Sequence, residues 1–243
     1  EYVDGVVWSV NGSTQITNGK VDVVYSTNGT AGPFNQTIAL GVTAADGRCN
    51  WNVTDTIGDN IVVRVVDSGK SYAYGNSDAC RIYGSLSVAA PAAGADWMAG
   101  AAKTISWTKT GTVGLVNIYA DYGSGYEGTP IVTGHDTSSA SSVAWVVPTD
   151  KVSNTVKLKI VSTSTPKTIP DVETGIFHTV ASFTLAAPAG NVLISGDPYT
   201  ITWTTTGSPV SRVRVEFYNG TSWSTIAGAD NIVNNGSFGP WTV

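Results

Sequence analysis

A tryptophan-bearing segment recurs three times in this 243-residue sequence, and its spacing constrains the fold more than any other feature. VVWSVNG, TISWTKTG and TITWTTTG each read as a strand followed by a turn, and a second tryptophan segment follows as CNWNV, VAWVV and GPWTV. The tryptophans, whose equivalents lie about 94 to 99 residues apart, are Trp8, Trp51, Trp107, Trp145, Trp203 and Trp241. Because a two-layer β-sandwich takes about 100 residues, the spacing predicts three copies of one such unit, which we call modules.

Within the modules, apolar and polar residues alternate, and no stretch sustains the period of a helix. In TVKLKIVS, the apolar residues Val156, Leu158 and Ile160 alternate with polar ones, and RVRVEFY at positions 212–218 shows the same pattern. Asn-Gly and Asp-Gly pairs, which tolerate the positive φ of tight hairpins, separate these runs. The sequence therefore predicts an all-β protein of tandem immunoglobulin-like antiparallel β-sandwiches.

A sequence segment that occurs twice, which we call the repeated phrase, predicts where the modules meet. SLSVAAPAAG (85–94) and SFTLAAPAG (182–190) each read as the last strand of one module, followed by a lead into the next. The predicted modules are residues 1–88, 89–185 and 186–243. No Gly/Ser-rich or Pro-rich spacer intervenes, so the sequence predicts closely joined modules and a stiff rod.

The outer modules are shorter than the middle one. The first lacks the lead-in phrase and its strand, and the third stops after its second tryptophan segment, about two strands short. Since a sandwich without two core strands would expose apolar faces and strand edges, we expect the chain to be a window on a longer array. Strands donated by a neighbouring copy are the alternative.

Composition narrows the class of protein and its partners. Only 13% of the residues are charged, and Ser, Thr, Asn and Gly supply most of the polarity. The net charge of −5 would repel a phosphate backbone, so we expect no nucleic-acid partner. No apolar run reaches the roughly 18 residues of a membrane span. The chain opens on Glu1, which indicates a mature or trimmed product, and we expect an extracellular or cell-surface location.

The segment PAAGADWMAGAAKTISW resembles the opening of the Ig-like domains related to yeast cell-wall β-glucan synthesis proteins (KNH-like). The matching residues of the second module are Pro91, Gly94, Trp97, Gly100, Thr104, Ile105 and Trp107. The third module keeps Pro188, Gly190, Gly196, Thr200, Ile201 and Trp203 but has no counterpart of Trp97, and the first module lacks this stretch. The resemblance covers about two thirds of the chain. It implies an extracellular seven-stranded sandwich used in tandem on cell surfaces, and it brings no catalytic residues.

Two groups of aromatic residues receive different interpretations. The six recurring tryptophans lie on the apolar faces of alternating strands, so core packing is favoured over a sugar-binding stripe. Four other aromatics lie in turn-rich stretches and do not recur. As candidates for glycan stacking or for contact with a neighbouring chain we take Tyr119, Tyr122, Tyr126 and Trp223.

The two cysteines and the sequons are candidate modification sites. Cys49 and Cys80 lie in the same predicted module, and in a secreted sandwich their spacing predicts a disulfide. Asn-x-Ser/Thr sequons, the candidate glycan acceptors, occur at Asn11, Asn28, Asn35, Asn52, Asn219 and Asn235. Glycosylation at these positions requires a lineage that modifies asparagine.

No constellation of catalytic or metal-binding residues stands out. His135 and His178 lie in different stretches without a Ser or Cys partner motif, and the four glutamates, Glu1, Glu127, Glu173 and Glu216, lie in unrelated contexts. Calcium held by Asp46, Asp55 and Asp59 at loop ends is an alternative, but aspartate is also favoured in turns. We therefore expect a protein without enzyme activity or cofactor.

Two functions are compatible with these observations. The first is a structural segment of a secreted or surface-anchored array, such as a stalk, fibre, sheath or surface layer, that sets distance and self-associates. The second is an adhesive or carbohydrate-binding module of a larger extracellular protein. The placement of the non-recurring aromatic residues should separate the two functions.

Overall fold

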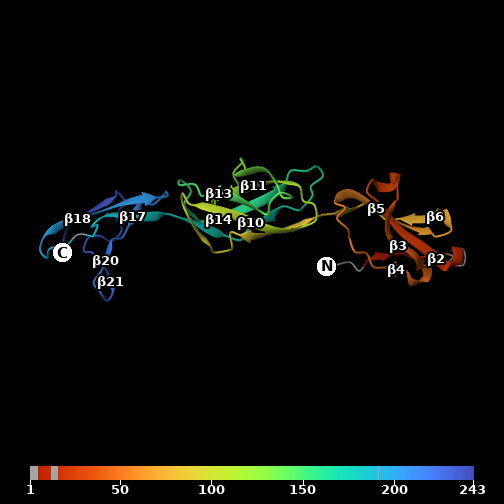
Figure 1. The fold of residues 1–243 in the computed structure, drawn as a ribbon, viewed down its shortest axis with the longest axis horizontal. Coiled ribbons are helices and arrows are strands. Elements are labelled where there is room, and N and C mark those ends of the chain that lie inside the picture. The colour runs from red at the N-terminus through yellow and green to blue at the C-terminus, as the bar shows by residue number, and fades with distance from the viewer. Residues whose placement is uncertain (1–4, 12–15, 191) are drawn as a thin grey trace.

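A computed structural model describes residues 5–11, 16–190 and 192–243, and it consists of three β-rich bodies arranged in a row along the longest axis (Figure 1). Within this part of the chain, the helical segments are three single turns of 3-10 helix: η2 (Thr17–Gly19), η3 (Gly29–Ala31) and η4 (Ala44–Asp46). None of the described helices has the length and apolarity to cross a membrane. The predicted all-β class is confirmed.

The second module is a complete two-layer sandwich. One layer has the order β13-β10-β8, formed by Ser142–Val146, Ala102–Thr110 and Ser85–Ala90. The other has the order β12-β11-β14-β16-β9, formed by Val132–Asp136, Leu115–Asp121, Ser153–Ser162, Phe177–Val180 and Asp96–Met98, and β15 (Val172–Glu173) also pairs with β14. All of these pairs are antiparallel except β16 with β9. This distribution of strands between two layers is the immunoglobulin-like topology.

The alternating residues predicted from the sequence form the core of this module. Val156, Leu158 and Ile160 of β14 are fully buried, and their polar neighbours point outward. Trp107 of β10 lies among them and is only 2% exposed. Trp97 packs against Trp145, with ring centroids 5.8 Å apart. Because strand residues alternate between faces, one apolar set per strand is enough to fill the space between the layers.

The first module has a similar larger sheet, without a counterpart of β9 among the described residues, and a smaller facing sheet. Its larger sheet has the order β3-β2-β5-β6, formed by Gln36–Thr43, Lys20–Ser26, Gly58–Asp67 and Lys70–Asn76, and β7 (Cys80–Ile82) also pairs with β5. Within the described part of the module, the facing sheet consists of β1 (Val6–Val7) and β4 (Arg48–Cys49). Trp8 and Trp51 are half-buried against the core formed by Val23, Tyr25 and Ile61.

In the third module the three-stranded layer is present and the facing layer is the smaller one. Its three-stranded sheet has the order β17-β18-β23, formed by Ser182–Ala187, Pro198–Thr206 and Ser237–Thr242. Facing it are two short pairs, β19 (Arg212–Val213) with β22 (Ile232–Val233), and β20 (Glu216–Tyr218) with β21 (Trp223–Thr225). Trp203 is buried and Trp241 is half-buried beside it. Among the described residues, no strands correspond to β14 and β16 of the second module.

The repeated phrase belongs to the following module, so its predicted position at the end of a module is wrong. Ser85–Val88 lies in β8, which pairs with β10, and Leu86 lies opposite Lys109. The start of the second copy lies in β17, which pairs with β18. The first strand of an immunoglobulin-like module and the last strand of the preceding one both alternate, so sequence pattern alone could not separate them. The strand pairing moves the boundaries back to residues 83–84 and 181.

The structure contradicts the predicted disulfide, because Cys49 and Cys80 are both free thiols. Cys49 lies in β4 beside Val6, and Cys80 lies in β7 beside Ile61 of the other sheet. Partial burial raises the pKa of both thiols. The spacing along the chain was compatible with a bridge, but spacing does not determine whether two side chains converge.

Trp107→Ala should destabilise the second module, because it removes one of the large buried side chains of its core. A buried tryptophan replaced by alanine destabilises a domain by about 3–5 kcal/mol. Calorimetry of the full chain should show a lower unfolding temperature for the second module. The matched control is Trp223→Ala, since Trp223 is 68% exposed and should change stability by no more than about 0.5 kcal/mol. Equal effects of the two substitutions would contradict this assignment of the core.

Candidate functional site: the junctions between modules

The connections between modules are only one or two residues long. Only Tyr83 and Gly84 separate β7 from β8, and only Ala181 separates β16 from β17. Even a fully extended residue spans no more than about 3.6 Å, so these connections bring the module ends into contact. The ribbon passes directly from each body to the next (Figure 1).

At the first junction, a carboxylate of one module accepts two hydrogen bonds from the next. Asp55, in the loop between β4 and β5, accepts a bond from the backbone N–H of Thr112 at 2.8 Å. Its other oxygen accepts the hydroxyl proton of Thr112 at 2.6 Å. The backbone N–H of Gly84 donates to the carbonyl oxygen of Thr168 at 2.9 Å. Two segments of the second module, at Thr112 and at Thr168, therefore contact the first module and the connection.

Glycine is required where the modules approach each other at this junction. Gly111 has φ +79°, and a Cβ there would lie 2.8 Å from the nearer carboxylate oxygen of Asp55. A Cβ on Gly84 would lie 2.9 Å from the carbonyl oxygen of Thr110. Because real Cβ atoms do not approach so closely, a side chain at Gly84 would displace the backbone of Thr110, and one at Gly111 would displace the carboxylate of Asp55.

The second junction uses the equivalent turn of the third module. Ser208, just after β18, donates its backbone N–H to Thr149 at 2.7 Å and accepts from the N–H of Val152 at 2.9 Å. Gly207, at φ +106°, leaves no space for a side chain, because a Cβ would lie 2.9 Å from the Cα of Ala181. The turns after TISWTKTG and TITWTTTG thus both contact the module before them.

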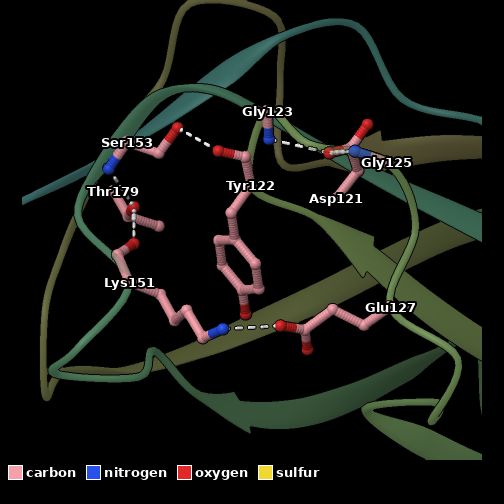
Figure 2. A network of polar contacts seen from close by, with 8 residues as sticks. All are labelled: Asp121, Tyr122, Gly123, Gly125, Glu127, Lys151, Ser153 and Thr179. Carbon is pink, nitrogen blue, oxygen red and sulfur yellow. Dashed lines mark hydrogen bonds and ion pairs between the residues drawn. The ribbon is translucent and has the colours of Figure 1, made fainter.

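A polar network in the second module holds the loop that receives Ser208 (Figure 2). Lys151 pairs with Glu127 at 2.7 Å, and Ser153 donates its backbone N–H to Thr179 at 2.9 Å. The hydroxyl of Thr179 donates to the carbonyl oxygen of Lys151. The hydroxyl of Ser153 donates to the carbonyl oxygen of Tyr122 at 2.7 Å. The loop from Thr149 to Val152 is therefore anchored at its C-terminal side to two other segments.

The segment that carries Tyr122 is itself closed by a turn (Figure 2). One carboxylate oxygen of Asp121 accepts bonds from the N–H groups of Gly123 and Gly125, at 2.7 and 2.9 Å. The side chain of Lys151 lies against the ring of Tyr122, with 5.4 Å between Nζ and the ring centroid. Burial raises the pKa of the Tyr122 hydroxyl, and the bond to Glu127 raises the pKa of Lys151. At neutral pH the network therefore contains a neutral tyrosine and a charged lysine.

The candidate binding aromatics do not gather on one face. Tyr119, Tyr122 and Tyr126 belong to the second module, where all three are half-buried. The ring of Tyr126 is covered by Lys159, whose Nζ lies 4.3 Å from the ring centroid. Trp223 belongs to the third module, where it stands exposed beside Tyr218 on the β20–β21 hairpin. Of the three tyrosines, Tyr122 therefore contacts the loop near the second junction, and Trp223 lies apart from it in the third module.

The other candidate residues take separate positions. All six sequon asparagines are exposed, although residues 12 and 13 of the first sequon lie outside the described part of the chain. Both oxygens of Asp55 are engaged by Thr112.

His135 packs edge to face on Trp107, and His178 pairs with Asp96 at 2.7 Å. Among the described residues, no three His, Cys, Asp or Glu side chains lie together as metal ligands would.

Sequence reasoning did not identify the junction residues. Asp55 was considered only as a calcium ligand, and Thr112, Thr149 and Ser208 were not considered. The available signal was the turn glycine that follows each TxxWTxT strand, Gly111 and Gly207, which recurs but carries no side chain to mark a contact.

No protein-family model matches the chain, and a search of curated proteins found no match. Among solved structures, fibronectin(III)-like modules of CbhA from Clostridium thermocellum match at 20% identity, covering 65% of this chain and 79% of that one, with a TM-score of 0.26. Three N-terminal domains of the Highly Immunogenic Outer Capsid protein of bacteriophage RB49 match at 10% identity, covering 92% and 76%, with a TM-score of 0.28. The N-terminal four Ig domains of Dscam1 isoform 4.44 match at 12% identity, covering 91% and 65%, with a TM-score of 0.32.

At TM-scores this low, none of these superpositions specifies the arrangement of the whole chain. The fold assignment therefore rests on the strand order of the second module. The resemblance to the KNH-like family stays a prediction.

Asp55→Ala should loosen the first junction. The hydrogen bonds from Thr112, with the side-chain bond contributing most, lower the pKa of Asp55 because they favour its ionised form. The contact is therefore complete above the ordinary aspartate pKa of about 3.9 and is lost as pH falls through the lowered value. The distribution of distances between spin labels on the first and second modules should widen in the variant at pH 7, and in the natural chain only on acidification.

Labels at Tyr72→Cys and Asn154→Cys, in a chain carrying Cys49→Ser and Cys80→Ser, would report this distance. The matched control is Asp46→Ala, which removes another exposed carboxylate of the first module. A distance distribution that does not change in Asp55→Ala would show that the bonds to Thr112 do not restrain the junction.

Proposed function

We propose that this chain is a stiff structural segment of an extracellular or cell-surface protein, in which tandem modules set distance and orientation. The observation that carries the proposal is the pair of junctions. Each connection has at most two residues, and each is flanked by direct hydrogen bonds between neighbouring modules. A surface layer, sheath, stalk or fibre needs such a spacer, because a flexible linker would let its modules pivot freely.

The mechanism of the spacer is mechanical. Bending at the first junction would break the two bonds to Asp55 and open the contact at Gly84. Bending at the second would separate Ser208 from Thr149 and Val152. Since the two junctions use equivalent turns, each added module would meet its predecessor in a similar way, as in other repeat proteins.

The composition of the surface supports an extracellular location. The glycines of the shared motif support the assignment to the KNH-like family. Polarity rests on hydroxyl and amide groups, with a net charge of −5. Gly94, Gly100, Gly190 and Gly196 of the shared motif all have positive φ, so the motif is explained by backbone geometry. Self-association through the polar faces, with exposed sequons as glycan acceptors, belongs to the same proposal.

A second function, adhesion or carbohydrate binding, is favoured by one observation. Trp223 and Tyr218 are exposed neighbours with ring centroids 5.5 Å apart, and an exposed aromatic pair can stack on a sugar. The pair lies on a hairpin away from both junctions, so the two functions can be tested separately.

Inserting Gly-Gly-Ser after Ala181 should convert the second junction into a flexible linker. We expect small-angle scattering from the natural chain to fit one extended shape, and scattering from the insertion variant to require a broad ensemble of shapes. The matched control is the same insertion after Gly220, in the β20–β21 turn. Scattering from the natural chain that already requires freely bending modules would overturn the proposal.

The carbohydrate function predicts a different result. If it holds, the chain should bind at least one polysaccharide in a pull-down assay, and Trp223→Ala should reduce that binding at least tenfold. Tyr72→Ala, which removes another exposed aromatic ring, should leave it unchanged. No retention on any polysaccharide, or equal retention of both variants, would count against this second function.

A further inference from the structure

The larger sheet of the first module carries apolar residues on both of its faces. The core-facing residues of β5 alternate with a second set that points to the outer face, formed by Val62, Arg64 and Val66. The corresponding outward positions of β14 in the second module begin with Lys157 and Lys159. A strand with apolar residues on both faces is typical of a sheet that is covered on both sides.

This outer face belongs to strands that are present and paired. In the first module β2 and β5 pair with each other as β11 and β14 do in the second, and β3 and β6 flank them. Val24 of β2 lies opposite Arg64 and adds another apolar side chain to the face. Val62 is buried, whereas Val24 and Val66 are half-buried. The face is therefore the outer surface of a paired sheet.

Arg64 lies at the centre of this face, in contact with two aromatic rings. Its Cζ is 3.5 Å from the ring centroid of Phe34 and 3.8 Å from that of Tyr74. Its Nε donates to Oδ1 of Asn76 at 2.8 Å, and it forms no ion pair with the described residues. The two rings and the amide fix the plane of the guanidinium, and the Nη groups keep their N–H donors for another acceptor.

The other charged residues of this sheet do not pair with Arg64. They are Lys20, Asp22, Asp59, Asp67 and Lys70. Asp22 shares the outer face, but its carboxylate accepts hydrogen bonds from a backbone N–H of β3 and from a serine hydroxyl after β5. Asp67 is buried and lies opposite Lys70, and Lys20 and Asp59 lie near strand ends. The centre of the face is therefore cationic, in a chain whose net charge is −5.

We infer that this face docks a partner polypeptide that presents a carboxylate surrounded by apolar side chains. The carboxylate would accept two parallel hydrogen bonds from the fixed guanidinium of Arg64. The apolar neighbours would cover the valines and the two rings, and Arg, Tyr and Phe are enriched at the centres of protein interfaces. A symmetric contact between two copies would bring Arg64 of each copy together, so charge favours a different partner surface.

This docking face goes beyond the spacer function and does not depend on the stiffness of the junctions. It would give the segment an attachment point on the first module for another polypeptide. The arginine would select a partner with a carboxylate, and the apolar floor would supply buried area.

The test uses the full chain and, as the probe, a library of short random peptides displayed on phage. Selection on the natural chain, after depletion on the Arg64→Lys chain, should enrich peptides that share an Asp or Glu flanked by apolar residues. Isothermal titration calorimetry with an enriched peptide should show saturable one-to-one binding. The same peptide with the amide in place of its acid should bind at least tenfold more weakly.

Two pairs of chain variants locate the binding. Arg64→Lys keeps the charge but lacks the planar fork, so it should weaken the peptide at least tenfold, whereas Arg48→Lys, at an exposed position of β4, should not. Tyr74→Ala should also weaken the peptide, whereas Leu115→Ala in the second module should not, although the two side chains have similar exposure, at 52% and 46%. Circular dichroism should show natural folding for all four variants.

Three results would overturn the inference. The first is a selection that yields no peptide dependent on Arg64, or an enriched peptide that binds equally well without its acid. The second is a dimer of the chain that Arg64→Lys abolishes, which would assign the face to a second copy. The third is a selection without peptides together with Arg64-dependent binding of polygalacturonate, which would assign the face to an acidic sugar.

Discussion

The rest of the structure depends on burying one apolar face of each strand between two layers. In the second module this burial is complete, because β10 brings Trp107 against the alternating residues of β11 and β14. Burial of a large apolar side chain contributes about 1.5–3 kcal/mol, so a few such strands make the module a folding unit. Where a layer lacks strands, as beside Leu185, the same alternation leaves apolar surface in solvent.

The junctions add a second constraint. Once two cores are one or two residues apart along the chain, their ends must touch, and the turn after each tryptophan strand becomes part of the interface. Gly111 and Gly207 allow this approach because they carry no side chain. Asp55 and Ser208 then supply polar contacts that resist bending. The spacer function thus follows from the length of the connection together with the shape of one turn.

Much of the fold could be predicted from residue patterns. The tryptophan spacing indicated three similar units, and the alternation in TVKLKIVS indicated which face of β14 is buried. The position of SLSV could not be predicted, because an alternating strand carries no mark of the sheet that it joins. The disulfide between Cys49 and Cys80 was wrong for a related reason, since spacing along the chain does not place two side chains together. The junction contacts were missed because their residues have ordinary turn chemistry.

The sequence by itself determined the class of fold, the number of modules and the core faces, because these depend on local alternation and on a repeat that can be read in one dimension. Only the tertiary structure decided which strands pair, to which module each strand belongs, and where the module ends meet. Those properties depend on contacts between residues far apart in the chain, such as Asp55 with Thr112. Their hydrogen bonds form only after the two cores have folded and brought the turns together.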